Sequence, residues 1–175
     1  TGVRLSSRTS PPNCYDDLLQ FDHNRPAPPE DGATVAVLLH GRNNHRGNLQ
    51  ALPPEWALVT PQGPHAGHPW GYGPGWAWYK YVVGDRVVEE TLGHSLSELE
   101  AFLEELPALL EFQPGRIVLG GFSEGATTRM AMAISRPDLV AAVIGFSGFL
   151  AESVKVPFSA LSPGTPPIFW GHGLL

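Results

Sequence analysis

The sequence of 175 residues has a single cysteine and no long hydrophobic run. The lone Cys14 excludes an internal disulfide and is typical of a reducing compartment, so we expect a cytoplasmic protein. No run reaches the ~18 consecutive apolar residues of a membrane-spanning helix, which excludes an integral membrane protein.

Charge is also scarce. Charged residues make up 16% of the chain, and 17 acidic against 11 basic residues give a net charge of −6. Lys and Arg never cluster beyond pairs, so we expect no nucleic-acid partner. His65 and His68 lie close in sequence, but no further ligand stands near them at zinc-type spacing, so we expect no metal.

Glycine and proline are abundant, with 20 and 18 copies. This share is above the average of globular proteins but below that of low-complexity chains, and it predicts a compact, loop-rich domain. The length fits one domain. We therefore expect a single domain over residues 1–175, with a loop-rich N-terminal segment at 1–33.

Short apolar runs alternate with helical patterns along the rest of the chain. The run Thr34–Leu39 predicts a strand buried on both faces, as in a parallel sheet. Ser95 and Glu98 form a capping box that predicts a helix start, and Pro107 should kink or interrupt that helix. The alternation predicts an α/β fold with a doubly wound, mostly parallel sheet. The other expected elements are strands at 56–60, 116–119, 139–145 and 167–170, helices at 95–110 and 125–135, and a long loop at 61–76.

The sharpest motif is Gly121-Phe122-Ser123-Glu124-Gly125, a G-x-S-x-G pattern between a predicted strand and a predicted helix. In this context it predicts a nucleophile elbow, a sharp turn that holds Ser123 in a strained backbone conformation at the carboxyl end of the sheet. The glycines let strand and helix pass closely, and the helix points free N–H groups toward the serine. Ser123 is therefore the candidate nucleophile.

A second motif, Leu39-His40-Gly41-Arg42, ends an earlier strand. A nucleophilic serine needs an oxyanion hole, made of the N–H after the serine and another N–H from a loop that follows such a strand. Those two residues are Glu124 and Arg42. His40 is a tempting general base, but a His-Gly pair at a strand end more often shapes the backbone, and we favour that interpretation.

Taken together, the motifs resemble the phospholipase/carboxylesterase family, the acyl-protein-thioesterase-like branch of the α/β-hydrolase fold. The resemblance covers the chain from residue 34 to its last residue and rests on the order of the motifs. In chain order they are Val37-Leu-Leu-His-Gly41, Thr60-Pro61 with Gly63-Pro64-His65, Trp76-Ala-Trp-Tyr79, Arg116-Ile-Val-Leu-Gly-Gly-Phe-Ser-Glu-Gly-Ala126 and Pro167-Ile-Phe-Trp-Gly-His-Gly173.

The resemblance implies an α/β-hydrolase fold with Ser123 as nucleophile and the backbone N–H groups of Arg42 and Glu124 as oxyanion hole. It implies that the segment with Trp76 and Trp78 lines the substrate cleft, with His40 nearby. From the residues alone, the aromatics of this segment fit a cleft wall and core packing about equally well. The implied reaction is hydrolysis of a small-molecule acyl ester through an acyl-enzyme, without a cofactor.

Two departures concern the neighbourhood of the serine. Glutamine usually follows the serine in this family, and here the residue is Glu124. A carboxylate beside a developing oxyanion is unfavourable unless it points away or is paired. The loop Arg42–Arg46 is more basic than usual, so we expect it to pair with Glu124 or to attract an anionic group of the substrate.

The third departure concerns the rest of the catalytic triad. In this fold the chain order is serine, then acid, then histidine. The family's acid follows the His-Gly at 172–173 after two more residues, here Leu174 and Leu175. No carboxylate after Ser123 stands at a triad position, and a Ser123–His172 dyad is the weaker alternative. We therefore expect the acid, the histidine and the last strand and helix to lie beyond residue 175, with the sheet truncated.

The sequence thus predicts a serine hydrolase of carboxylic esters or thioesters, of carboxylesterase or lysophospholipase type. Two alternatives stay open. One is a catalytically inactive, hydrolase-like binding module, and the other is a scaffolding domain whose basic loop at 42–46 binds a partner. The sequence carries no indication of oligomeric state.

Overall fold

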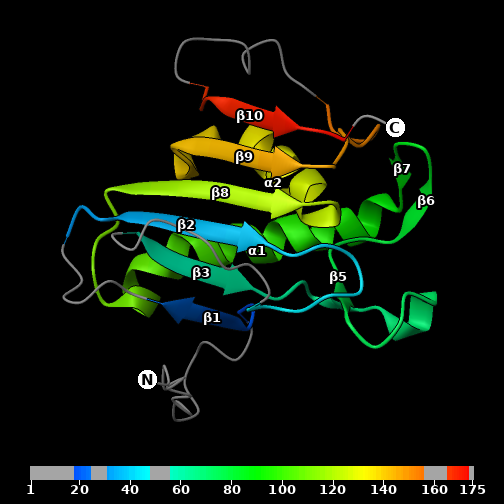
Figure 1. The fold of residues 1–175 in the computed structure, drawn as a ribbon, viewed down its shortest axis with the longest axis horizontal. Helices are drawn as coiled ribbons and strands as arrows, with labels where there is room; N and C mark the ends of the chain where they lie inside the picture. Colours follow the sequence, from blue (N-terminus) through cyan, green and yellow to red (C-terminus); the bar gives the residue numbers. More distant parts are fainter. Residues whose placement is uncertain (1–17, 25–30, 48–55, 156–164, 174–175) are drawn as a thin grey trace.

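A six-stranded sheet forms the centre of the computed structural model, which describes residues 18–24, 31–47, 56–155 and 165–173 (Figure 1). The strand order is β1-β3-β2-β8-β9-β10. Every neighbouring pair is parallel except β1 and β3. This confirms the predicted, mostly parallel sheet. Its strands are β1 (Phe21–Asn24), β2 (Thr34–Leu39), β3 (Ala57–Pro61), β8 (Arg116–Phe122), β9 (Ala142–Phe146) and β10 (Ile168–Gly171).

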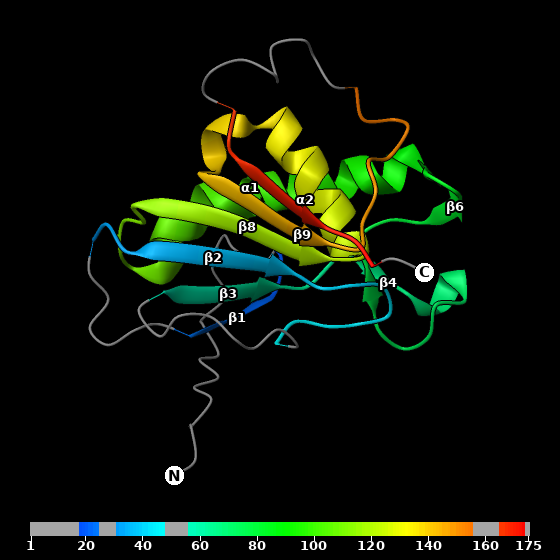
Figure 2. The same ribbon diagram turned by 45° about the horizontal axis from the view of Figure 1, so that its top comes forward.

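Two α-helices, α1 (Glu89–Leu110) and α2 (Glu124–Ser135), lie side by side behind the sheet in the view of Figure 1. Turning the molecule shows α2 close to β8 and β9 (Figure 2). A short 3-10 helix, η2 (Pro137–Leu139), follows α2. Neither α-helix of the described part has the length and apolar character that crossing a bilayer requires.

The strand β2 shows why the apolar run at 34–39 predicts a parallel-sheet interior. It lies between β3 and β8, and its Val35, Val37 and Leu39 are fully buried. Each such side chain contributes roughly 1.5–3 kcal/mol through the burial of apolar surface. The observed strand matches the predicted one residue for residue.

The helix α1 differs from the expectation at both ends. It begins at Glu89, six residues before Ser95, with Val88 as its N-cap. The capping-box prediction was therefore wrong, because Ser95 lies inside the helix and its Oγ donates a hydrogen bond to the buried carbonyl of Trp78. Pro107 does not interrupt the helix, because it falls in the last turns and the helix ends just after it, at Leu110.

Several short elements were not predicted. Within the expected loop at 61–76, β4 (His65–Ala66) pairs with β5 (Trp76–Ala77), and the 3-10 helix η1 (His68–Trp70) lies between them. A second hairpin, β6 (Tyr81–Val83) with β7 (Arg86–Val87), leads into α1. The strand expected from Leu139 begins only at Ala142, because η2 ends on Leu139, the first residue of that run. Cys14, Leu174 and Leu175 lie outside the described residues.

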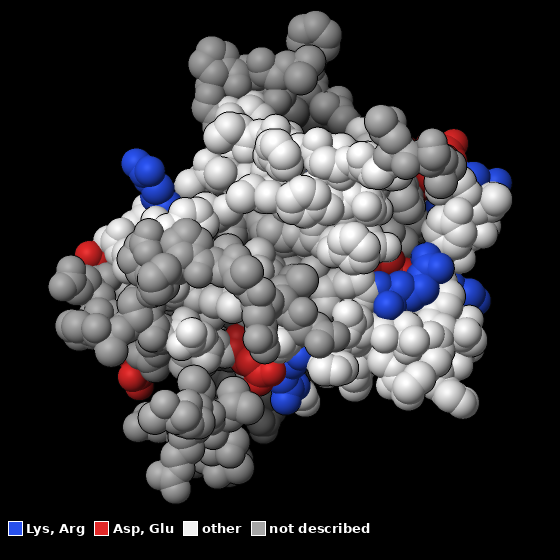
Figure 3. Space-filling view, viewed as in Figure 1, with Lys and Arg blue, Asp and Glu red and all other residues white. Residues whose placement is uncertain are grey.

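The surface reflects the low charge of the chain. On the face shown in Figure 3, acidic and basic side chains stand in small separate groups, and uncharged residues form the area over β9 and β10. Four large apolar side chains of these strands are exposed, namely Phe146, Ile168, Phe169 and Trp170.

Candidate active site

Ser123 lies where β8 ends and α2 begins, which is the position that the G-x-S-x-G motif predicts. Its backbone has φ 52° and ψ −117°, a conformation that costs a non-glycine residue of the order of 1–3 kcal/mol. The surrounding backbone holds it there. The Ser123 N–H donates to the carbonyl of Phe146 at 2.9 Å, and the Ser123 carbonyl accepts from the N–H of Thr127 at 3.1 Å.

Two glycines make this turn sterically feasible. A Cβ atom on Gly121 would lie 2.5 Å from the carbonyl carbon of Gly125, and one on Gly125 would lie 2.2 Å from the carbonyl oxygen of Leu39. Both distances are far below any real contact of a Cβ atom. The strand, the helix and the end of β2 therefore approach one another as closely as they do only because these positions lack side chains.

The loop after β2 lies directly against Ser123. A Cβ atom on Gly41 would be 3.5 Å from the Cβ of Ser123. This contact brings the next residue, Arg42, to the edge of the sheet from which Ser123 projects. The backbone N–H of Glu124 belongs to the first turn of α2, where N–H groups have no partner within the helix. The structure thus brings together the three residues expected to form a nucleophile and an oxyanion hole.

The carboxylate of Glu124 is turned into the protein and is paired. Only 1% of its side chain is exposed. One of its oxygens accepts a hydrogen bond from Nε of Arg42 at 2.5 Å, and the other accepts one from the backbone N–H of Trp78 at 3.1 Å. Burial raises the pKa of the Glu124 carboxyl, and these donors oppose that rise only in part.

The guanidinium of Arg42 lies over two aromatic rings. Its central carbon lies 4.4 Å from the centre of the Tyr72 ring and 4.9 Å from that of Tyr81. The two tyrosines are also linked to each other, because the backbone N–H of Tyr81 donates to the Tyr72 hydroxyl at 2.7 Å. Sequence reasoning missed this aromatic contact, since its members come from the loop after β2, the loop after η1 and the start of β6, and nothing in their spacing links them.

His40 has a structural place rather than a catalytic one. Its ring is 2% exposed; Nε2 accepts from the N–H of Gly63 at 2.8 Å, which leaves Nδ1 to donate to the Gly41 carbonyl at 2.8 Å. Burial lowers the pKa of His40 and so favours this neutral form. His40 and Trp78, whose side chain is fully buried, therefore do not line an open cleft. Of the three expected cleft residues, only Trp76 is partly exposed.

Other histidines and carboxylates singled out in the sequence have backbone or side-chain contacts of their own. Nε2 of His65 donates to the carbonyl of Thr91 at 3.0 Å. In the described ranges, no three His, Cys, Asp or Glu side chains gather as metal ligands would. His172 follows β10, is exposed, and has its Nδ1 3.1 Å from the Gly173 carbonyl. Asp138 pairs with Arg136.

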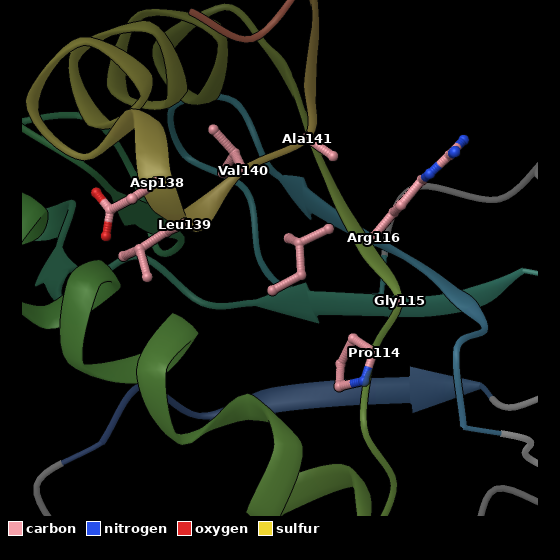
Figure 4. A pocket seen from close by; sticks show the side chains of 8 residues that line it. Pro114, Gly115, Arg116, Asp138, Leu139, Val140 and Ala141 are labelled. Carbon is pink, nitrogen blue, oxygen red and sulfur yellow. The ribbon is translucent and has the colours of Figure 1, made fainter. Parts of the chain in front are cut away.

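One surface hollow lies at the opposite end of β8 from Ser123. Its lining includes Pro114, Arg116, Asp138 and Leu139 (Figure 4). Because β8 has 7 residues, the hollow and Ser123 are separated by the length of the strand, roughly 20 Å. In open α/β sheets, ligands bind outside the carboxyl ends of the strands. This hollow is at the amino ends and is not the candidate active site.

A buried cation lies below the outer strands. The Arg129 side chain on α2 is fully buried; its guanidinium faces Gly145 of β9, with its central carbon 5.3 Å from the centre of the Trp170 ring on β10. None of its side-chain nitrogens has a hydrogen-bond partner in the described part of the chain. Burial lowers the pKa of Arg129 to about 10.

The fold and the strand-to-helix serine turn define an α/β-hydrolase fold, and comparison with known proteins agrees. The chain belongs to the Phospholipase/Carboxylesterase family, whose model matches residues 27–175. This shows the family that the motif order resembles, and with it a hydrolase fold of carboxylesterase and phospholipase type.

Three similar solved structures carry the names of an esterase and two carboxylesterases. Esterase PE8 is 25% identical with a TM-score of 0.69, over 89% of this chain and 75% of that one. A carboxylesterase from Mesorhizobium loti is 15% identical with a TM-score of 0.69, over 90% and 87%. The Bacillus cereus carboxylesterase is 15% identical with a TM-score of 0.71, over 91% and 89%. No curated protein sequence matched the chain significantly.

Proposed function

We propose that the protein is a serine hydrolase that cleaves carboxylic ester or thioester bonds, with Ser123 as nucleophile. The observation that carries the proposal is the strained backbone of Ser123, at φ 52°, between β8 and α2 and against Gly41. Strain of this kind is retained where it serves a function. Here it would present Oγ to a substrate at the carboxyl edge of the sheet.

The proposed reaction is acyl transfer. Ser123 Oγ attacks the acyl carbonyl, and the backbone N–H groups of Arg42 and Glu124 stabilise the negative oxygen of the tetrahedral intermediate. The alcohol or thiol leaves with a proton, and water then releases the acid from the acyl-enzyme. The serine is activated, as in other hydrolases of this kind, by a histidine held by an acid. Neither a metal nor a cofactor takes part in this proposal.

The inward direction of the Glu124 carboxylate supports the proposed oxyanion hole. A free carboxylate beside the developing oxyanion would raise the barrier. In this protein the negative charge is bound by Arg42 Nε and by the backbone N–H of Trp78, away from the surface. The backbone N–H of Glu124 can then act without opposition from its own side chain.

The experiment is active-site labelling. A fluorophosphonate probe should label the protein covalently, and Ser123→Ala should abolish the labelling. Ser147→Ala is the matched control, because Ser147 also has a positive φ, 56°, just after the neighbouring strand β9, but no α-helix starts there. Equal labelling of the Ser123→Ala variant would contradict the proposal. Hydrolysis of 4-nitrophenyl and thioester substrates then separates the two bond types.

A second candidate is a hydrolase-like binding or scaffolding module without turnover. The observation that favours it is that, within the described ranges, no histidine paired with a carboxylate lies against Ser123. It predicts that the protein neither reacts with the fluorophosphonate nor turns over esters. Capture of a partner that depends on Arg42 and Arg46 but not on Ser123 would identify this function.

A further inference from the structure

The two side chains of the Arg42–Glu124 ion pair differ in their exposure to solvent. The carboxylate is 1% exposed and lies inside the protein, whereas 35% of the Arg42 side chain is exposed. The loop that carries Arg42 also passes close to Ser123, since a Cβ atom on Gly41 would lie 3.5 Å from the Ser123 Cβ. The loop next to Ser123 therefore carries a partly exposed positive group, and the matching negative group is withdrawn from solvent.

The guanidinium has donors left over. Its Nε donates to Glu124 Oε1. The two terminal nitrogens carry the other N–H groups, arranged as a planar fork that fits two oxygens at once. No described residue accepts a hydrogen bond from these terminal nitrogens. A fork with unused donors at the edge of an active site is a suitable receptor for an oxyanion.

The fork is also held in place before any ligand arrives. Tyr72 and Tyr81 contact it from within 5 Å, at 4.4 and 4.9 Å from ring centre to guanidinium carbon. Together with the hydrogen bond to Glu124, these contacts remove much of the freedom that a surface arginine loses on binding. A ligand that docks here gains hydrogen bonds without ordering a long side chain, and such preorganisation favours affinity.

The neighbouring arginine of the same loop is engaged elsewhere. Arg46 donates through Nε to Asp22 at 3.2 Å and through a terminal nitrogen to Gln20 at 2.6 Å. These partners belong to β1 and the residue before it. From the sequence, the basic loop at 42–46 could either pair with Glu124 or attract an anionic group of the substrate. In the structure its two arginines differ: Arg46 holds the loop to the β1 segment, and Arg42 lies at the candidate active site.

On the basis of the proposed hydrolase function, we propose that the terminal nitrogens of Arg42 bind a singly charged oxyanion group of the substrate, placed a few atoms from the ester that Ser123 attacks. The substrate class is therefore an ester that carries a carboxylate or a phosphodiester in addition to the scissile bond. Both groups offer two oxygens to the fork and a single negative charge, which matches one guanidinium whose own charge Glu124 already balances in part.

The test compares matched substrates. The ratio of kcat/KM for mono-4-nitrophenyl adipate over its neutral methyl ester is measured in the wild type and in Arg42→Gln, which keeps the backbone N–H. We expect the ratio to fall by roughly tenfold or more in the variant, since charge-assisted hydrogen bonds are lost. Arg46→Gln is the matched control and should keep the wild-type ratio. An equal ratio in the wild type and in Arg42→Gln would overturn the inference.

A second pair of substrates, one neutral and one charged, shows whether the oxyanion that Arg42 binds is a carboxylate or a phosphodiester. Monobutyryl glycerol is compared with its phosphodiester, in which the glycerol carries a methyl phosphate. A preference for the phosphodiester that depends on Arg42 assigns a lipid-like headgroup, and a preference only for the adipate assigns a carboxylate. If neither charged substrate depends on Arg42, the inference fails.

A binding measurement separates this inference from the proposed function. Calorimetry is performed with monomethyl adipate on Ser123→Ala and on the double variant with Arg42→Gln, with dimethyl adipate as neutral control. Binding that is lost only in the double variant supports the anion site even if Arg42→Gln abolishes turnover. If the wild type binds the monoester through Arg42 but hydrolyses no ester, the proposed hydrolase fails and the anion site stands. Equal binding by the two variants overturns the anion site.

Discussion

The carbonyl oxygen of Leu39 lies 2.2 Å from the position that a Cβ atom on Gly125 would occupy. Both groups are backbone or fixed to it, so neither can move aside as a flexible side chain would. The end of β2 and the first turn of α2 therefore contact each other through a position that only glycine fits.

We expect Gly125→Ala to destabilise the protein by about 3 kcal/mol, the upper part of the range for overpacking in a well-packed region. The matched control is Gly93→Ala in α1, where an added Cβ meets nothing within 4 Å. That substitution should stabilise by roughly 0.5–1 kcal/mol, since alanine favours a helix. The free energy of unfolding in urea measures both, and equal effects of the two substitutions would contradict this account.

The strain at Ser123 gives a second prediction. Ser123→Gly should be more stable than Ser123→Ala by about 1 kcal/mol, because glycine adopts a positive φ without the cost that alanine retains. Thermal unfolding of the two variants measures the difference. Ser135 at the end of α2 is the control position, where alanine should be the more stable of the same two substitutions. The same order at both positions would show that Ser123 is not strained.

Buried histidines predict how stability depends on pH. The pKa of His40 is lowered in the folded protein, chiefly by burial, so the unfolded chain binds a proton more readily. This contribution to stability is complete above the unfolded pKa of about 6.5 and is lost as the pH falls toward the folded pKa. We expect the free energy of unfolding to decrease as the pH is lowered from 7.5 to 5.5.

His65, whose pKa burial also lowers, adds to the same trend. His40→Gln should reduce the slope of stability against pH, and His65→Gln should reduce it independently. Urea unfolding at several pH values gives the slopes. An unchanged slope in His40→Gln would exclude a buried neutral imidazole at this position.

The buried Arg129 gives a fourth prediction. A buried charge without hydrogen-bond partners costs several kcal/mol, and apolar replacements of buried ionic groups often stabilise by about 1–4 kcal/mol. Since no hydrogen-bond partner for Arg129 lies in the described residues, Arg129→Met should raise the unfolding free energy of the 175-residue chain within that range. Arg129→Lys, which keeps the charge, should give no such gain. A loss of stability in Arg129→Met would show that the guanidinium is paired.

The sequence predicted most closely those elements that depend on local patterns. A continuous apolar run has few alternatives to a strand in a parallel sheet, and β2 matches its prediction at both ends. Similarly, the G-x-S-x-G pattern has a steric reason at every glycine, so strand, turn and helix all lie where the motif indicates.

Features that depend on long-range side-chain contacts could not be predicted. Glu124 binds Arg42, 82 positions away, and the sequence offers pairing only as one of two expectations. The start of α1 was missed because its first turn carries the polar Glu89 and Glu90 instead of the apolar spacing that marks its later turns. The sequence does not indicate the burial of Arg129, because an arginine on a helix usually faces solvent.

The hydrogen bonds at the carboxyl edge of the sheet connect Ser123 to the outermost strand. The Ser123 N–H donates to Phe146, and the next residue of that segment, Ser147, donates to Gly171 of β10. Strain in a turn persists only while its surroundings resist relaxation. The strand β10 therefore helps to hold the strained backbone of Ser123 in place. Weakening the hydrogen bonds of this edge would allow the Ser123 backbone to leave its strained conformation, because β10 is linked to the serine through Phe146 and Ser147.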